Sequence, residues 1–240
     1  MNPEKELETA RSGLQILGID TSGKNASVAV WNDGNIRAQY FVQTKMTHSQ
    51  VILPLCQKML GDLEISVKDI DKFAVAAGPG SYTGLRIGIS AVKALSFGLG
   101  KKCNGISTLE AIAYNFAGAA ECFVCAMIKA RLDIVYCAVF RIKGDSVSYC
   151  MNDTMMTTKE LADKLKEFEG RIIAAGDAAE DFVSEISDDR ITLAPAHLRG
   201  QLASGICMAS AVREGQEPDD IDALYMQITK AEKDLLKKDL

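Results

Sequence analysis

The chain has 240 residues and a formal net charge of −5, from 27 basic and 32 acidic side chains. Apolar residues make up 48% and charged residues 25%, which is ordinary for a globular protein with a buried core. No apolar run reaches the length that spans a bilayer, and no basic stripe of the kind found on nucleic-acid binders is present. These properties exclude membrane-spanning helices and argue against direct, charge-driven binding to RNA or DNA.

Residues 1–13 are charged and contain no apolar segment, so we expect an extension before the first strand rather than a secretory signal. The seven cysteines are odd in number and lie mostly within apolar patterns, which is typical of reduced, buried thiols in a cytoplasmic protein. Cys122 and Cys125 have the spacing of a redox or metal pair. We place them on a strand, where residues three apart face opposite sides, and no second pair completes a zinc site. A structural role for both is the favoured interpretation.

The first half of the sequence predicts three strands, a helix, a strand, a second helix and a further strand. The turn sequence NDGN at 32–35 predicts a hairpin between the second and third strands. Thr47 and Gln50 predict a capping box at the start of the first helix, and Pro54 is expected to bend or weaken that helix. The expected ranges are 14–20, 26–31, 36–42, 47–60, 73–77, 81–99 and 103–106.

The second half repeats this order less regularly. Ser107 is expected to cap a helix with Glu110 as its partner, and Thr157 with Glu160 opens another helix. The remaining expected strands are 122–128, 134–140, 146–150, 171–175 and 223–226, and the remaining helices are 157–168, 178–186, 204–213 and a charged end from residue 229.

The repeated order predicts an α/β protein of two similar lobes, each with a mixed sheet and flanking helices. Three strands, a helix, a strand and a helix is the order of the ribonuclease-H-like lobe that actin, sugar kinases and chaperone ATPases share. We divide the chain into the extension 1–13, an N-terminal lobe 14–106, and a C-terminal lobe with its tail at 107–240.

The segment 78–88, with the sequence GPGSYTGLRIG, connects the strand 73–77 to the helix that follows it. Such a turn suits either a phosphate cradle or close backbone packing. It lacks the Gly-Lys-Ser/Thr ending of a P-loop. Each glycine inside a helix is unfavourable by about 1 kcal/mol relative to alanine, so we expect a close neighbour on the helix face that holds small residues, either the sheet or a partner chain. That face carries Gly84, Gly88, Ala91, Leu95 and Gly98.

Candidate catalytic residues are few. Asp20 follows the first strand, where a carboxylate can hold a metal ion, but the neighbouring strands 26–31 and 73–77 contain no acid, so a turn residue is the favoured interpretation. His48 and His197 are the only histidines, and His48 has no second histidine at helical spacing. We expect His48 to make a local hydrogen bond at the start of its helix.

A set of motifs in this order resembles the TsaB (YeaZ) family, accessory proteins of bacterial tRNA threonylcarbamoyladenosine synthesis. The motifs are IDTS at 19–22, HS at 48–49 with LP at 53–54, GPGSYTGLRIG at 78–88, AMIKAR at 126–131 with VY at 135–136, and DALYM at 222–226 with AE at 231–232. Lys129, where the family usually has an acid, and Met226-Gln227, in place of Leu-Arg, depart from the pattern. For Lys129, Arg131 and Tyr136, a hairpin that has an exposed basic turn is the favoured interpretation.

The resemblance implies two ribonuclease-H-like lobes in a cytoplasmic protein with no catalytic residues, metal or cofactor of its own. It implies a catalytic paralogue, TsaD, as the partner, which modifies the adenosine 3′ of the anticodon in tRNAs that read codons beginning with A. A TsaE-type ATPase joins the assembly, tRNA is met only through the complex, and the chain alone forms a homodimer through the same helices.

By their positions on the helices 48–60 and 81–99, eight residues are expected at the partner interface, although each is equally a candidate for the core. They are Leu53, Gln57, Leu60, Gly84, Leu85, Arg86, Gly88 and Ile89. The alternative function, an actin-like-fold ATP-dependent kinase or a peptidase, is disfavoured because the sequence offers neither a histidine pair nor a nucleophile–base–acid set.

Overall fold

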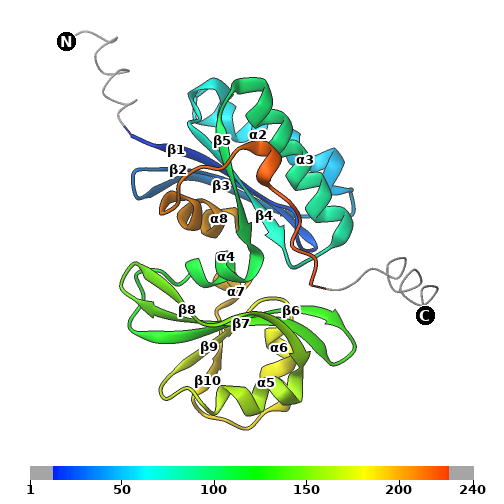
Figure 1. Ribbon diagram of the computed structural model, residues 1–240, viewed down its shortest axis with the longest axis vertical. Coiled ribbons are helices and arrows are strands. Elements are labelled where there is room, and N and C mark those ends of the chain that lie inside the picture. Colours follow the sequence, from blue (N-terminus) through cyan, green and yellow to red (C-terminus); the bar gives the residue numbers. More distant parts are fainter. Residues whose placement is uncertain (1–12, 227–240) are drawn as a thin grey trace.

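Residues 13–226 are described by the computed structural model and form two five-stranded sheets, one beyond the other along the molecule (Figure 1). The strands of the first sheet are β1 (Gln15–Asp20), β2 (Asn25–Asn32), β3 (Asn35–Gln43), β4 (Lys72–Gly78) and β5 (Lys102–Ser107). The strands of the second sheet are β6 (Cys122–Arg131), β7 (Ile134–Lys143), β8 (Ser146–Thr157), β9 (Ile172–Ala175) and β10 (Ile191–Leu193).

The two sheets repeat one topology. Their strand orders are β3-β2-β1-β4-β5 and β10-β9-β6-β7-β8. In each sheet the first three strands in the sequence pair antiparallel, and the two later strands join in parallel. This arrangement confirms the predicted fold of two mixed-sheet lobes.

Helices cover both faces of each sheet (Figure 1). The helices are α2 (His48–Asp62), α3 (Tyr82–Leu99), α4 (Thr108–Tyr114), α5 (Thr158–Leu165), α6 (Ala179–Glu185), α7 (Ala196–Arg199) and α8 (Ala203–Ala211), with short 3-10 turns η1 (Val67–Asp69) and η2 (Pro218–Asp220). On the first sheet, α2 and α3 pack on one face and α8 on the other. On the second, α4 packs on one face and α5 with α6 on the other.

Helices α4 and α8 lie against each other between the sheets and join the lobes. The Ser107 hydroxyl caps α4 by accepting from the Glu110 N–H at 3.3 Å. The Glu110 carboxylate, expected to complete a capping box, instead accepts two bonds from Arg213 at 2.6 and 2.7 Å, just beyond α8. The ion pair therefore ties the start of α4 to the end of α8.

The predicted elements in the described part of the chain are found within a few residues, except that one strand is longer than expected and one does not form. Two short elements were not predicted. Strand β8 extends to Thr157 rather than to residue 150, and its pairing with β7 contains register shifts. Strand β10 and helix α7 are three and four residues long, too short to show a periodic pattern. Residues 223–226 are extended but join no strand, and the helix expected from residue 229 lies outside the described residues.

The lobe division between residues 106 and 107 stays a prediction. Although α8 follows the second sheet in the sequence, it packs against β1 and β2 of the first. The Cys207 thiol there lies 3.7 Å from the Ile16 carbonyl oxygen and 3.6 Å from that of Ala29. Residues 203–226 thus pack against the first sheet, although they follow the second sheet in the sequence.

Six of the seven cysteines are buried, as expected, and Cys150 is exposed. Cys122 belongs to the core between the second sheet and α4, whereas Cys125 belongs to the core on the opposite face, under α5 and α6. The two side chains therefore lie on opposite sides of β6, which confirms their structural interpretation.

The segment 78–88 packs its backbone directly on the turn after β1. A Cβ atom at Gly84 would lie 2.0 Å from the Thr21 carbonyl oxygen, and one at Gly80 would lie 2.5 Å from that of Ser22. The Ser81 N–H donates to the Ser22 carbonyl at 2.7 Å, and the Thr21 hydroxyl donates to the Gly84 carbonyl at 2.7 Å. The close neighbour of Gly84 and Gly88 is therefore the chain itself, at the turn after β1, whereas Gly98 on the same predicted face meets nothing within 4 Å. Ala91 and Leu95 of that face line the outer surface of the lobe.

Gly84→Ala is expected to destabilise the protein by about 1–3 kcal/mol because the added methyl group meets backbone that has no rotamer to change. The matched control is Gly98→Ala, on the same helix, where a Cβ atom meets nothing within 4 Å. This control is expected to stabilise the protein by up to about 1 kcal/mol through helix propensity. Urea unfolding of both variants checks the pair. Equal effects of the two substitutions would contradict the packing described here.

A buried lysine caps the end of α8. The Lys72 ammonium, at the start of β4, donates to the carbonyl oxygens of Ser210 at 2.7 Å and Arg213 at 2.8 Å. Burial lowers the pKa of this amine, so these two acceptors supply the hydrogen bonds that water would otherwise make. Cationic groups are also favoured at helix C-termini. Lys72 thereby fastens α8 to the first sheet.

Lys72→Met is expected to lower the free energy of unfolding by about 1.5–3 kcal/mol, because carbonyl groups at the end of α8 lose a charged donor. Lys68→Met, at an exposed lysine four residues away, serves as the control. Chemical denaturation followed by circular dichroism measures both. If the Lys72 variant is as stable as the control, the bonds to α8 contribute nothing to folding.

Candidate functional site

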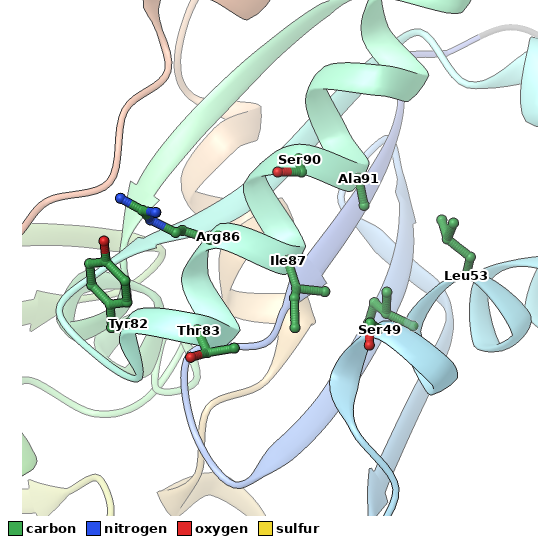
Figure 2. A pocket seen from close by; sticks show the side chains of 9 residues that line it. Ser49, Leu53, Tyr82, Thr83, Arg86, Ile87, Ser90 and Ala91 are labelled. Atoms are coloured by element: carbon green, nitrogen blue, oxygen red, sulfur yellow. The ribbon is translucent and has the colours of Figure 1, made fainter.

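A groove runs between α2 and α3 on the outer face of the first lobe (Figure 2). Its volume is about 520 Å³, and it is lined by Ser49, Ile52, Leu53, Tyr82, Thr83, Arg86, Ile87, Ser90 and Ala91. Figure 2 shows Ile87 and Ala91 of α3 facing Ser49 and Leu53 of α2, with Tyr82 and Arg86 together on the side of α3 away from α2. The lining contains one charged side chain, that of Arg86.

A second hollow of about 470 Å³ lies farther along the same two helices. Leu53 lines both hollows, and its side chain is 49% exposed. Gln57, Leu60 and Leu95 contribute to the second one. We call the surface formed by both hollows the α2–α3 face. An exposed leucine between two apolar hollows is the kind of surface that marks a protein-binding site.

The eight residues expected at an interface divide into three groups. Leu53, Gln57 and Arg86 are exposed on the α2–α3 face. Leu60 and Ile89 are each 8% exposed and belong to the core of the first lobe, and of the two only Leu60 lines a hollow.

Gly84, Leu85 and Gly88 need a correction, because the structure buries them against their own chain. Leu85 is 1% exposed and belongs to the core of the first lobe. Gly84 and Gly88 face Thr21, and a Cβ atom at Gly88 would lie 2.4 Å from the Thr21 hydroxyl oxygen. The part of α3 that lines the groove includes Tyr82, Ile87 and Ala91. The small-residue pattern assigned Ala91 to the closely packed face and did not single out Tyr82 or Ile87.

Three side chains cluster where α3 begins. The Arg86 guanidinium lies 4.3 Å from the ring centroid of Tyr82, and its Nε–H donates to the Tyr225 hydroxyl at 3.0 Å. The two tyrosine rings are stacked, with centroids 5.0 Å apart. Tyr225 comes from the C-terminal segment, 139 residues away from Arg86 in the sequence.

Asp20 is buried at the end of β1 and acts in a turn, as expected. Its Oδ1 accepts from the Ser22 N–H at 2.8 Å and from the Ser22 hydroxyl at 2.6 Å. Its Oδ2 has no hydrogen-bond partner among the described residues. Burial raises the pKa of this carboxyl, although the bonds from Ser22 act in the opposite direction. A lone buried carboxyl with no companion acids is a poor site for a metal ion.

The surroundings of Asp20 do not fit a nucleotide with its metal ion. The N–H groups of Ser81 and Leu85 donate to backbone carbonyls, and that of Gly84 donates to the Ser81 hydroxyl, so they are not free to bind a phosphate. Within residues 13–226 no three His, Cys, Asp or Glu side chains come together as a metal site. The donor set lacks the lysine and the companion acids that phosphate and metal would need.

His48 contacts a different part of the fold than expected. Its Nε2 lies 3.1 Å from the Asn25 carbonyl oxygen at the start of β2, 23 residues away, so the bond is tertiary rather than local. The Thr47–Gln50 capping box forms as predicted. His48 thus holds the first turn of α2 to the sheet.

The basic residues after Ala126 lie on the predicted β6–β7 hairpin. Lys129 forms an ion pair with Asp181, and its N–H donates to the Asp177 carboxylate at 2.8 Å. Asp181 lies on α6 and Asp177 lies just before it, so these two acids accommodate a lysine at this position.

No helix among the described residues is long and apolar enough to cross a membrane.

Comparison with known proteins places these features in a family. The family model described as "TsaD: tRNA N6-adenosine threonylcarbamoyltransferase" matches residues 42–205. The protein "tRNA threonylcarbamoyladenosine biosynthesis protein TsaB" of Escherichia coli is 33% identical over 167 residues, which cover 68% of this chain and 71% of the relative. The protein of the same name in Bacillus subtilis is 30% identical over 166 residues, with the same coverage.

Solved structures share the fold. YeaZ from Pseudomonas aeruginosa has a TM-score of 0.75 at 24% identity and covers 88% of this chain and 99% of its own. The activator of the 2-hydroxyisocaproyl-CoA dehydratase from Clostridium difficile, with a TM-score of 0.50 at 12% identity over 82% of this chain and 94% of its own, shares the fold alone. From the extent and identity of the sequence matches, the chain belongs to the TsaB family.

Proposed function

We propose that this chain is a non-catalytic subunit that binds and activates a TsaD-type threonylcarbamoyltransferase. The reaction is the formation of N6-threonylcarbamoyladenosine in tRNAs that read codons beginning with A. The observation that carries the proposal is the α2–α3 face, an exposed apolar surface on a chain of the TsaB family. A TsaE-type ATPase is a further expected member of the assembly in the cytoplasm.

The chemistry of the described residues supports a role without catalysis. His48 is engaged by Asn25, and Asp20 is buried and engaged by Ser22. Neither residue has a partner with which to form a nucleophile–base–acid set. These residues therefore offer no support for the alternative kinase or peptidase function.

Binding at the α2–α3 face is expected to act on TsaD by changing conformational populations. A subunit that binds the active arrangement of its partner more tightly than the inactive one shifts the partner toward activity. Two apolar hollows on either side of Leu53 suit side chains projecting from partner helices, and residues at the centre of such a contact carry most of its binding energy.

The same face accounts for the expected homodimer. When TsaD is absent, two copies of this chain can bury their α2–α3 faces against each other. The homodimer and the complex with TsaD then compete for one surface, so the apparent affinity for TsaD falls as the concentration of this chain rises.

The chain contacts tRNA only as part of the complex, in keeping with its net charge of −5.

Leu53→Asp is expected to weaken binding to the TsaD-type protein by about thirtyfold or more, equivalent to about 2 kcal/mol, because a charge replaces a central apolar contact. Titration calorimetry measures the affinity. Modification reconstituted from ATP, bicarbonate, threonine and tRNA should fall in parallel. Fold integrity is checked by thermal unfolding, since Leu53 is already half exposed.

The matched control is Leu132→Asp, at a fully exposed leucine in the β6–β7 turn. This variant is expected to bind and to support modification like the unaltered chain. Full affinity and full modification with the Leu53 variant would refute the proposed face.

A further inference from the structure

The C-terminal strap, residues 216–226, is fixed along its length to the first lobe, beside α3 (Figure 1). Gln216 exchanges two backbone hydrogen bonds with Cys103 of β5, at 3.0 and 2.8 Å. The Leu224 N–H donates to the Ala77 carbonyl at 2.7 Å. Gly78 leaves the room for this approach, because a Cβ atom there would lie 2.6 Å from the Leu224 carbonyl oxygen. These contacts therefore fix the position of the next residue, Tyr225.

Tyr225 and Tyr82 hold the Arg86 side chain from two directions. The Nε–H is bonded to the Tyr225 hydroxyl, and the guanidinium lies over the ring of Tyr82. A guanidinium has five N–H donors, so the four on the terminal nitrogens remain. Among the described residues no carboxylate forms an ion pair with Arg86, which is also true of Arg37, Arg131 and Arg171. What distinguishes Arg86 is that two aromatic side chains hold it.

The surroundings define what Arg86 can bind. It is exposed at the rim of the α2–α3 groove, whose other lining residues are uncharged. One cation beside an apolar groove suits a single carboxylate that flanks apolar side chains. A nucleic-acid backbone would need several cations along its path, and the chain has a net charge of −5.

We propose that Tyr82 and Tyr225 position Arg86 as a receptor for one carboxylate of the TsaD-type partner, beside the apolar contacts in the groove. This inference rests on the proposed function. The two terminal nitrogens can meet a carboxylate with two parallel hydrogen bonds. Because the tyrosines already restrain the side chain, less conformational entropy is lost on binding. The C-terminal strap is thereby part of the partner site, with Tyr225 as a positioning residue.

The test measures the affinity of the full chain for the full-length TsaD-type protein of the same organism. Arg86→Ala is expected to weaken binding at least about tenfold and to flatten its salt dependence. Tyr225→Phe keeps the ring against Tyr82 but removes the hydroxyl, and should weaken binding about threefold to tenfold. Tyr136→Phe, in the second lobe, is the matched control and should change nothing.

A double variant distinguishes positioning from direct contact. If Tyr225 acts through Arg86, adding Tyr225→Phe to Arg86→Ala weakens binding no further. If the two effects add, the positioning role is overturned. Thermal unfolding of Tyr225→Phe should match that of the unaltered chain, and a lowered midpoint with unchanged affinity also overturns the role.

Charge reversal tests the chemistry of the ligand. Arg86→Glu should weaken binding more than Arg86→Ala, and reversal of one acidic residue on the TsaD-type protein to lysine should restore it. The carboxylate proposal is overturned if no single reversal restores binding, or if the Arg86 variants lose affinity for tRNA but not for the protein.

The outcomes for Arg86 and Leu53 separate the two proposals. Loss of binding with Leu53→Asp but not with Arg86→Ala overturns the carboxylate receptor and leaves the proposed function standing. Unchanged binding with both variants overturns the proposed face together with the inference.

Discussion

The first turns of α3 lie directly on the backbone of the turn after β1, with no side chain between them at Gly84. Only glycine allows two backbone segments to come this close, and Gly80 packs against the Ser22 backbone in the same way. The hydrogen bonds from Ser81 and Thr21 hold the contact. Since α3 is anchored in this way, the contact decides which of its faces is buried and which is exposed.

This contact also explains how a fold shared with nucleotide-binding proteins serves here as a binding scaffold. The turn after β1 and the glycine-rich segment bond to each other, and the N–H groups of Ser22, Ser81 and Gly84 and the Ser22 side chain are engaged within the chain. The same packing turns Gly84 and Gly88 inward and leaves Ile87, Ala91 and Arg86 outward, beside Leu53 of α2. The engagement of these groups within the chain and the exposure of the proposed face therefore have a common physical origin.

The C-terminal part of the chain links the lobes and completes the proposed face. Helix α8 lies on the first sheet, where Lys72 caps its end, and Arg213 ties it to Glu110 of α4. Beyond α8, the strap reaches α3 and brings Tyr225 to Arg86. A sequence-distant segment thus supports the surface that the first hundred residues form.

Much of the fold was predictable because its signals are local. Strand and helix periodicity, the capping boxes at Thr47 and Thr157, and the glycine-rich turn each depend on residues near in sequence. The order of elements then predicted two mixed sheets, and the spacing of Cys122 and Cys125 placed them on opposite faces of a strand. Very short elements such as β10 were not predicted, because three residues are too few to show a periodic pattern of apolar side chains.

The candidate site was predictable only to the level of its helices. The sequence by itself determined the family, the fold and the helices α2 and α3, since sequence motifs and hydrophobic periodicity depend only on the order of residues along the chain. Only the tertiary structure decided that Gly84, Leu85 and Gly88 face inward, that His48 bonds to Asn25, and that Tyr225 orders Arg86. The physical reason is that the buried side of a helix depends on what packs against it, and here the deciding neighbours, Thr21 and Tyr225, come from distant parts of the sequence.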